Sequence, residues 1–168
     1  MKFKTDKLKA RADKALAALQ FNIDYKLGRG GMFPANSTPA DISGQCDCSG
    51  FTSWCIGMSR FQEDKHKPWS KQIPWLGTEA MVNDAKHKQL VFVKIDEPVL
   101  GCLVAYKAKD GNSSSYGHTG IVARFNARGQ AIVVDCASNR RASAMGERMG
   151  DFFTNKGGIY FVLKEDII

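Results

Sequence analysis

The two halves of the chain carry different patterns of apolar residues, and this change constrains the fold more than any other feature. The first half favours helices joined by long loops. The second half holds short runs rich in β-branched residues, separated by turn-forming stretches: Leu103–Tyr106, His118–Phe125, Ala131–Ala137 and Ile159–Leu163. Helices followed by strands predict an α+β domain, whose β-sheet half begins at about residue 100.

The first half predicts three helices. Residues 5–19 place leucine and alanine side chains on one stripe at helical spacing. Residues 48–58 are mostly apolar and predict a second, buried helix. Residues 78–87 predict a short third helix, with the threonine at its start as N-cap. The segments between them, 21–45 and 60–77, predict an extended loop and a surface excursion.

Length and composition limit the class of protein. The 168 residues, with 43% apolar and 24% charged residues, predict one folded domain covering 1–168 and argue against disorder. No run approaches the roughly 18 apolar residues of a membrane span. The formal net charge of +7 favours an anionic partner, which could be nucleic acid, a membrane surface or bacterial cell wall.

The N-terminal segment is basic and lacks a continuous apolar block, so we expect no signal peptide and synthesis in the cytoplasm. Four of its cations recur at helical spacing and form a basic ridge: Lys4, Lys7, Arg11 and Lys14. A solvated helix face is the simpler interpretation of this ridge. The alternative is a face that contacts an anionic partner.

The cysteines indicate a reduced protein without a metal. Their number, five, is odd, and no secretion signal accompanies them, which disfavours a disulfide framework. Three of them follow a C-x-C-x6-C spacing, which is not that of common zinc sites. We therefore expect no metal and no cofactor, and we interpret Cys55 as a small core residue.

Cys48 is the candidate nucleophile. It lies in Asp47-Cys48-Ser49-Gly50-Phe51, where the long loop enters the second predicted helix. The positive end of a helix dipole and its free N–H groups favour a thiolate. Such surroundings lower a cysteine pKa from ~8.5 into the range of ~3.5–7.5, and the thiolate is the reactive form.

A histidine and an aspartate in the predicted sheet complete the constellation. His118 starts a strand within Gly117-His118-Thr119-Gly120, whose small residues allow close approach to the ring. Asp135 lies inside the apolar run of the next strand, where a carboxylate needs a partner. A hydrogen bond to the imidazole would satisfy it. Asp135 could instead cap a turn or pair with Arg140 or Arg141, and nearby Asn139 is a rival for orienting the ring.

These motifs resemble those of the NlpC-type cell-wall cysteine peptidases. The Asp47–Phe51 and Gly117–Val122 segments carry the specific part of the resemblance. Tyr25–Gly28 and Val134–Ser138 are similar to two weaker family segments. The resemblance implies a papain-like fold, with the nucleophile at a helix N-terminus packed on an antiparallel sheet.

The resemblance also implies an activity, hydrolysis of an amide bond in peptidoglycan stem peptides. By matched position, Cys48 is the nucleophile, His118 the base and then the acid, and Asp135 the orienting residue. The backbone N–H of Cys48 contributes to the oxyanion hole. Three matched positions line the substrate cleft: Tyr25, Asp47 and Ser49.

The sequence departs from the family pattern at two places. The orienting residue is often histidine in the family, whereas Asp135 stands here. The usual Pro-Gly-Asp before the histidine motif is replaced within Val99–Cys102, which alters a turn.

Other functions fit parts of the pattern. A papain-like acyltransferase or deamidase would use the same triad. A nucleic-acid binder would suit the charge, but the chain has no recognised nucleic-acid-binding motif, so we expect no specific nucleic acid as partner.

For a wall hydrolase without a signal peptide, we expect release or delivery to the periplasm or outside, with a possible delivery or immunity partner. The basic ridge is then a candidate wall-docking surface. Phe61, Trp69 and Trp75 are candidates for a lid or substrate wall, or for packing against the domain.

Overall fold

The computed structural model describes residues 1–60, 75–109 and 116–168. In chain order, its helical elements are α1 (Thr5–Ala17), η1 (Ala18–Gln20), α2 (Cys48–Cys55), α3 (Thr78–Asn83), η2 (Asp84–Lys88), α4 (Asp151–Thr154) and η3 (Lys164–Asp166). The strands are β1 (Asp24–Tyr25), β2 (Gln45–Cys46), β3 (Phe92–Ile95), β4 (Leu103–Tyr106), β5 (His118–Phe125), β6 (Ala131–Cys136), β7 (Met145–Met149) and β8 (Ile159–Leu163).

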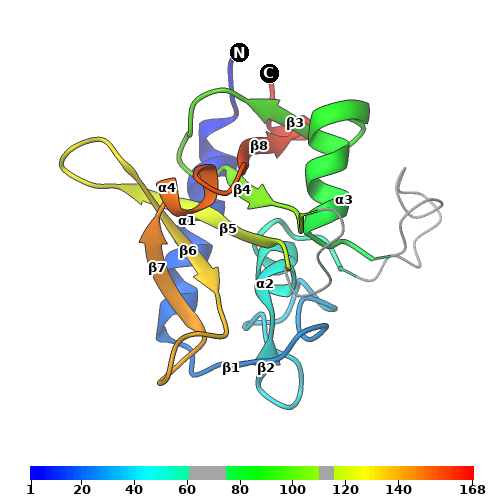
Figure 1. Cartoon of the computed structure of the whole chain (residues 1–168), viewed down its shortest axis with the longest axis vertical. Helices are drawn as coiled ribbons and strands as arrows, with labels where there is room; N and C mark the ends of the chain where they lie inside the picture. Colours follow the sequence, from blue (N-terminus) through cyan, green and yellow to red (C-terminus); the bar gives the residue numbers. More distant parts are fainter. Residues whose placement is uncertain (61–74, 110–115) are drawn as a thin grey trace.

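A six-stranded antiparallel sheet forms the centre of the molecule, in the order β3-β8-β4-β5-β6-β7 (Figure 1). A separate parallel pair, β1 with β2, lies below it and leads into α2. The two chain ends lie side by side, where Phe3 bridges Ile167. The predicted α+β class with an antiparallel sheet is confirmed.

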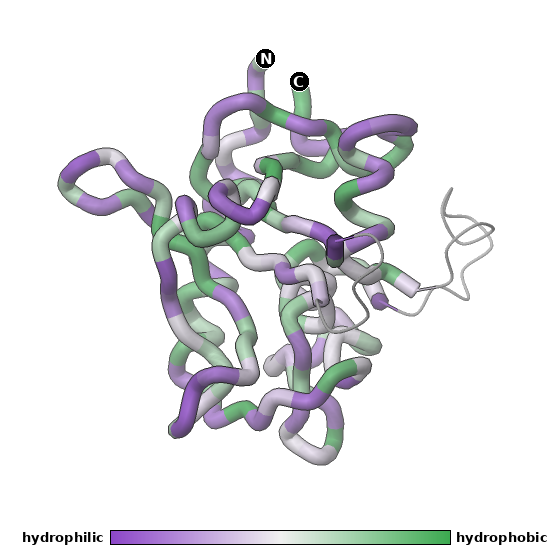
Figure 2. The backbone as a smooth tube through the Cα atoms, in the orientation of Figure 1, coloured by the Kyte–Doolittle hydropathy of each residue, from purple (hydrophilic) through white to green (hydrophobic). Residues whose placement is uncertain are grey.

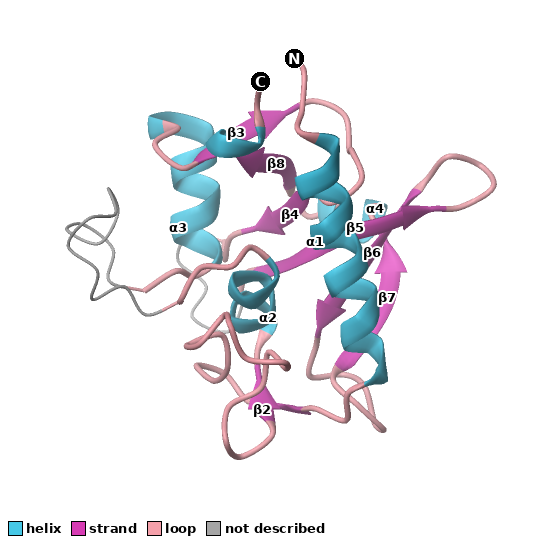
Figure 3. Cartoon of the chain, turned by 180° about the vertical axis from the view of Figure 1, so that it is seen from behind, coloured by secondary structure: helices cyan, strands magenta, loops and turns pink. Residues whose placement is uncertain are grey.

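Alternating strand residues serve two hydrophobic clusters, because successive side chains point to opposite faces of a sheet. Leu103 and Ala105 of β4 join the cluster formed with α1, α2 and α3, which Figure 3 shows on one face of the sheet. Val104 points the other way and packs with Phe153 of α4. Burial on both faces therefore fixes the strands that carry the site. The loop between β5 and β6, by contrast, is hydrophilic (Figure 2).

Several predicted boundaries were wrong by a few residues. The helix expected over 48–58 ends at Cys55, where Ile56 caps it and Gly57 takes a φ of 73°. The helix expected over 5–19 is α-helical only to Ala17 and then tightens into η1. The sheet also begins earlier than residue 100, because β3 pairs with β8 at its edge. Gly77, not Thr78, is the N-cap of α3.

The basic ridge is a solvated face only in part: Lys4 and Lys7 are exposed, whereas Arg11 is buried and Lys14 is half-buried. Arg11 is 6% exposed and forms a two-pronged ion pair with Asp166, at 2.8 and 3.0 Å. Lys14 donates to the Trp54 carbonyl at 2.6 Å and lies over the indole ring. Lys7 is 3.7 Å from Glu165. The helix therefore directs these cations to the chain's own C-terminal segment and to α2, so we do not retain the docking interpretation.

The loop before α2 packs closely on the helix. Gly31 has a φ of 70°, and a Cβ at this position would collide with the backbone of Gly50. A glycine at position 31 therefore lets the loop approach the first turn of α2. Two residues of the expected excursion, Phe61 and Trp69, lie outside the described residues. Within the described parts of the chain, no helix combines the length and apolar character needed to cross a bilayer.

Candidate active site

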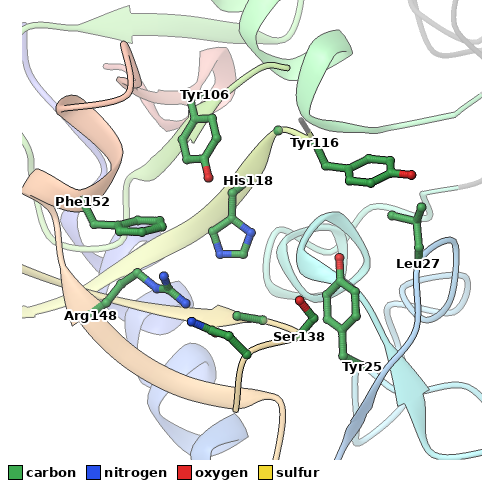
Figure 4. Close-up of a pocket in the computed structure, with 11 residues that line it drawn as sticks. Tyr25, Leu27, Tyr106, Tyr116, His118, Ser138, Arg148 and Phe152 are labelled. Carbon is green, nitrogen blue, oxygen red and sulfur yellow. The ribbon is translucent and has the colours of Figure 1, made fainter. Parts of the chain in front are cut away.

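A cleft between α2 and the sheet brings the two ends of the sequence motif together. It comprises a cavity of about 390 Å³ lined by His118 and one of about 330 Å³ lined by Cys48. Tyr25, Leu27 and Tyr116 line both cavities, so the two adjoin. Figure 4 shows the histidine side, with side chains contributed by the β1 region, β4, β5, β7 and α4.

Cys48 is the first residue of α2, as the motif predicted. Asp47 caps the helix by accepting a hydrogen bond from the Gly50 N–H at 2.8 Å. The backbone N–H groups of Thr119 and Ser49 hydrogen bond with the Cys48 sulfur and favour its ionised form. The Thr119 contact places the thiol beside the residue that follows His118 in β5.

The expected low pKa of Cys48 was wrong. The side chain is almost fully buried, and burial raises the pKa of Cys48 to about 12, with the Asp47 carboxylate adding to the shift. The helix N-terminus and the nearby Arg60 oppose this shift but do not overcome it. In the unliganded protein the group is therefore a neutral thiol, and it needs a base to become a nucleophile.

His118 is the candidate for that base, and its ring is held in place by two neighbours. Its Nε2 lies 2.7 Å from Oδ2 of Asp135, across the β5–β6 pair. Its ring stacks on Phe153, with centroids 5.5 Å apart and planes 10° from parallel. The carboxylate and the phenyl ring together fix the imidazole. Because Nε2 is engaged by Asp135, Nδ1 is the nitrogen left for the thiol and substrate.

Asp135 has more partners than the sequence suggested. It is fully buried, and besides His118 it pairs with Arg140, whose Nη1 lies 2.6 Å from Oδ1. Arg148 of β7 contacts Oδ2, the same oxygen that bonds the imidazole. The ion pair with Arg140 was one of the alternatives left open, and it coexists with the histidine contact. Asn139 lines the cavity, but no hydrogen bond to His118 is present among the described residues.

Asp47 and Ser49 are held by a residue that the sequence did not reveal. Arg60 is 1% exposed, and its guanidinium bonds both oxygens of Asp47, at 2.7 and 3.0 Å. It also donates to the Ser49 hydroxyl at 2.6 Å. Asp47 additionally accepts from the Gly28 N–H at 2.7 Å. Asp47 and Ser49 both line the cavity that holds Cys48, and their side chains are also bonded within the chain.

Two aromatic side chains form the walls of the cleft. Tyr25 lines both cavities, and burial raises the pKa of its hydroxyl above the ordinary range, so the phenol stays neutral. Trp75 lines the Cys48 cavity and lies under the Arg60 guanidinium, 4.2 Å from its ring centroid. The sequence left Trp75 as a candidate for a lid, a substrate wall or packing against the domain, and in the structure it both packs on Arg60 and lines the cavity.

Residues 1–60, 75–109 and 116–168 contain no cluster of three or more histidine, cysteine or acidic side chains that suits a metal ion. All five cysteines are free and buried. Cys55 lies in the main hydrophobic cluster, which agrees with its interpretation as a core residue.

The α+β fold, with a cysteine at a helix N-terminus and a histidine on an antiparallel sheet that line adjoining cavities, is of the papain-like class. Within that class, the CHAP domain model matches residues 37–137, which is more than half of the chain, and the chain belongs to the CHAP family. CHAP domains are papain-like domains of the NlpC/P60 type found in cell-wall hydrolases, which are typically enzymes. The resemblance found in the sequence is thus confirmed. No curated protein matches the chain.

Proposed function

We propose that this chain hydrolyses an amide bond in the stem peptide of peptidoglycan through a Cys48–His118–Asp135 mechanism. The observation that supports it most directly is the His118–Asp135 hydrogen bond, in a cleft that is also lined by Cys48. The membership of the chain in the CHAP family supports the same reaction. The fold alone would not indicate a reaction, because papain-like folds host several.

The first half of the reaction forms a covalent intermediate. His118 takes the thiol proton of Cys48 as the sulfur attacks the amide carbonyl. The tetrahedral intermediate then collapses to a thioester, and His118 gives the proton to the departing amine. Asp135 holds the ring in place and stabilises the imidazolium that forms in between.

The second half regenerates the thiol. A water molecule attacks the thioester carbonyl while His118 accepts its proton. The C–S bond then breaks, the carboxylic acid product leaves, and His118 returns the proton to the Cys48 sulfur. The backbone N–H of Cys48 supports the developing oxyanion, since it lies at the N-terminus of α2, where N–H groups have no acceptor within the helix. Loss of one such donor costs about 2.7–4 kcal/mol in related reactions. Tyr25 is proposed to contact substrate, because it lines both cavities.

The test is digestion of purified peptidoglycan followed by mass spectrometry of the soluble fragments. We expect stem-peptide fragments from the wild-type protein and none from Cys48→Ala. Cys102→Ala is the matched control, because Cys102 is equally buried but lies in the second hydrophobic cluster. A Cys48→Ala protein that still releases fragments would contradict the mechanism.

The same experiment separates the alternative reactions. An acyltransferase would leave the muropeptides uncut and add an acyl group to an acceptor. A deamidase would shift fragment masses without shortening the peptides.

We propose that the protein acts on the wall, in the periplasm or outside, after release or delivery, and that its domain spans 1–168. Recovery of the tagged protein from cytoplasmic, periplasmic and external fractions tests the location.

A further inference from the structure

The cleft contains one charged side chain, Arg148, that has no role in the proposed triad. Arg148 lies outside the matched residues 37–137 and lines the cavity of about 390 Å³ on the His118 side. Its Nε contacts Oδ2 of Asp135 as an ion pair but makes no hydrogen bond among the described residues. In the described part of the chain, its two terminal nitrogens have no hydrogen-bond partner, and Figure 4 shows the guanidinium directed towards the space beside His118.

The charges around this cavity leave a positive excess. Asp135 is paired with both Arg140 and Arg148, so one carboxylate faces two guanidinium groups. Lys156 adds a third cation near the rim, 4.5 Å from the centroid of Phe152. Arg148 lies 4.2 Å from the same ring. Among the described residues, no acidic side chain lines the cavity itself.

The geometry points to Arg148 as a carboxylate-binding residue for the part of the substrate that leaves as the amine. This inference rests on the proposed function. His118 delivers a proton to the leaving amine, so that half of the substrate lies on the histidine side of the cleft. Arg148 and His118 contact the same oxygen of Asp135. The guanidinium therefore lies next to the imidazole, close enough to bind the substrate residue that follows the cut bond.

An arginine suits this role for a chemical reason. Its planar group can bond Asp135 with one edge and still present terminal N–H groups to a second carboxylate. Phe152 supports the flat face of the guanidinium and restricts its rotation. A stem-peptide residue that carries a free carboxylate next to the released amine is therefore preferred over the same residue as a carboxamide.

The test compares two synthetic muropeptides that differ only at the residue on the leaving side of the cut bond, as carboxylate or carboxamide. We expect wild-type kcat/KM to favour the carboxylate by about ten- to hundredfold, as for a hydrogen bond to a charged group. Arg148→Gln should bring the ratio close to one. Arg148→Lys, which keeps the charge but not the fork, should give an intermediate ratio.

Arg140→Gln is the matched control. Arg140 also pairs with Asp135, but it donates to the backbone of Asp135 and Ala144 and does not line the cavity. Its loss should lower kcat for both peptides and leave their ratio unchanged. Equal wild-type kcat/KM for the two peptides, or an unchanged preference in Arg148→Gln, would overturn the carboxylate site alone. Failure to cut either peptide would overturn the proposed function itself.

Discussion

Arg60 and Asp47 form a buried two-pronged ion pair directly behind the nucleophile, with N–O distances of 2.7 and 3.0 Å. Arg60 also donates to the Arg29 carbonyl at 2.7 Å, so it joins the loop before α2 to the N-cap of that helix. The position of Cys48 thus depends on a residue twelve positions later in the chain, just before the undescribed segment 61–74.

Replacing Arg60 with methionine should destabilise the protein strongly, because it leaves the Asp47 carboxylate buried with no ionic partner. The expected loss is about 3–5 kcal/mol in the free energy of unfolding, measured by urea denaturation. Arg124→Met is the control, since Arg124 makes a similar two-pronged pair with Glu147 at the surface. That exposed pair should contribute much less, because solvent screens its charges. Equal losses in the two variants would show that the buried pair has no special role.

Asp135→Asn should reduce kcat by about two to four orders of magnitude, because an amide neither fixes the imidazole in the same way nor stabilises the imidazolium. Asn139→Ala should have a small effect, because Asn139 makes no hydrogen bond to His118 in the described structure. Single-turnover kinetics on a muropeptide measures both. A larger loss in the Asn139 variant would reassign the orienting role.

The elements of the site were predictable to different extents, for physical reasons. Cys48 and His118 follow from local sequence, because a loop-to-helix entry and a glycine-flanked strand start are short-range patterns. The partner of Asp135 was only partly predictable: the histidine and Arg140 were foreseen, whereas Arg148 comes from a strand paired through the sheet register. Arg60 was missed because a buried arginine has no periodic signature.

The pKa of Cys48 was mispredicted for a related reason. The helix N-terminus is visible in the sequence, but the burial of the thiol and the ionised Asp47 beside it are tertiary facts. The basic ridge failed likewise, because helical spacing gave its face correctly but not the C-terminal segment that covers it. Local pattern thus located the candidate reacting groups, while long-range packing determined their electrostatic surroundings.

Alkylation of Cys48 should be slow near neutral pH and accelerate as the pH rises, since the pKa of Cys48 lies at about 12 and only the thiolate reacts. Iodoacetamide labelling at pH 6, 8 and 10, followed by peptide mass spectrometry, measures this directly. Unfolded protein, in which the thiols have ordinary pKa values, is the control and should react much faster at pH 8. Rapid labelling of folded Cys48 at pH 6 would restore the low-pKa prediction.

The buried thiols should also make the folded protein less stable in alkali. Burial raises the pKa of Cys102 from 9.0 to about 12, so the unfolded chain releases this proton at a lower pH than the folded one. The stabilising contribution is therefore complete below pH 9 and is lost as the pH rises towards 12. The expected loss is on the order of 1 kcal/mol for each such thiol between pH 9 and 10, measured as the urea unfolding free energy.

Cys102→Ala provides the matched comparison for this alkaline effect. The variant loses some packing at every pH, but its unfolding free energy should fall less steeply above pH 9 than that of the wild type. The difference between the two slopes isolates the contribution of one thiol. Parallel curves would mean that Cys102 titrates alike in the folded and unfolded chain.

Arg11→Leu should lower stability without changing the reaction, because Arg11 bonds Asp166 and the Gly101 carbonyl rather than any group in the cleft. Removal of one partner leaves the fully buried Asp166 carboxylate uncompensated, and we expect a loss of about 3–5 kcal/mol in unfolding free energy. Lys9→Leu is the control, as Lys9 pairs with Asp13 on the exposed face of α1 and should contribute about 0.3–0.5 kcal/mol. Peptidoglycan binding and kcat/KM, assayed at a temperature where Arg11→Leu remains folded, should match the wild type. A selective loss of wall binding at full folding would return the N-terminal helix to the role of a docking surface.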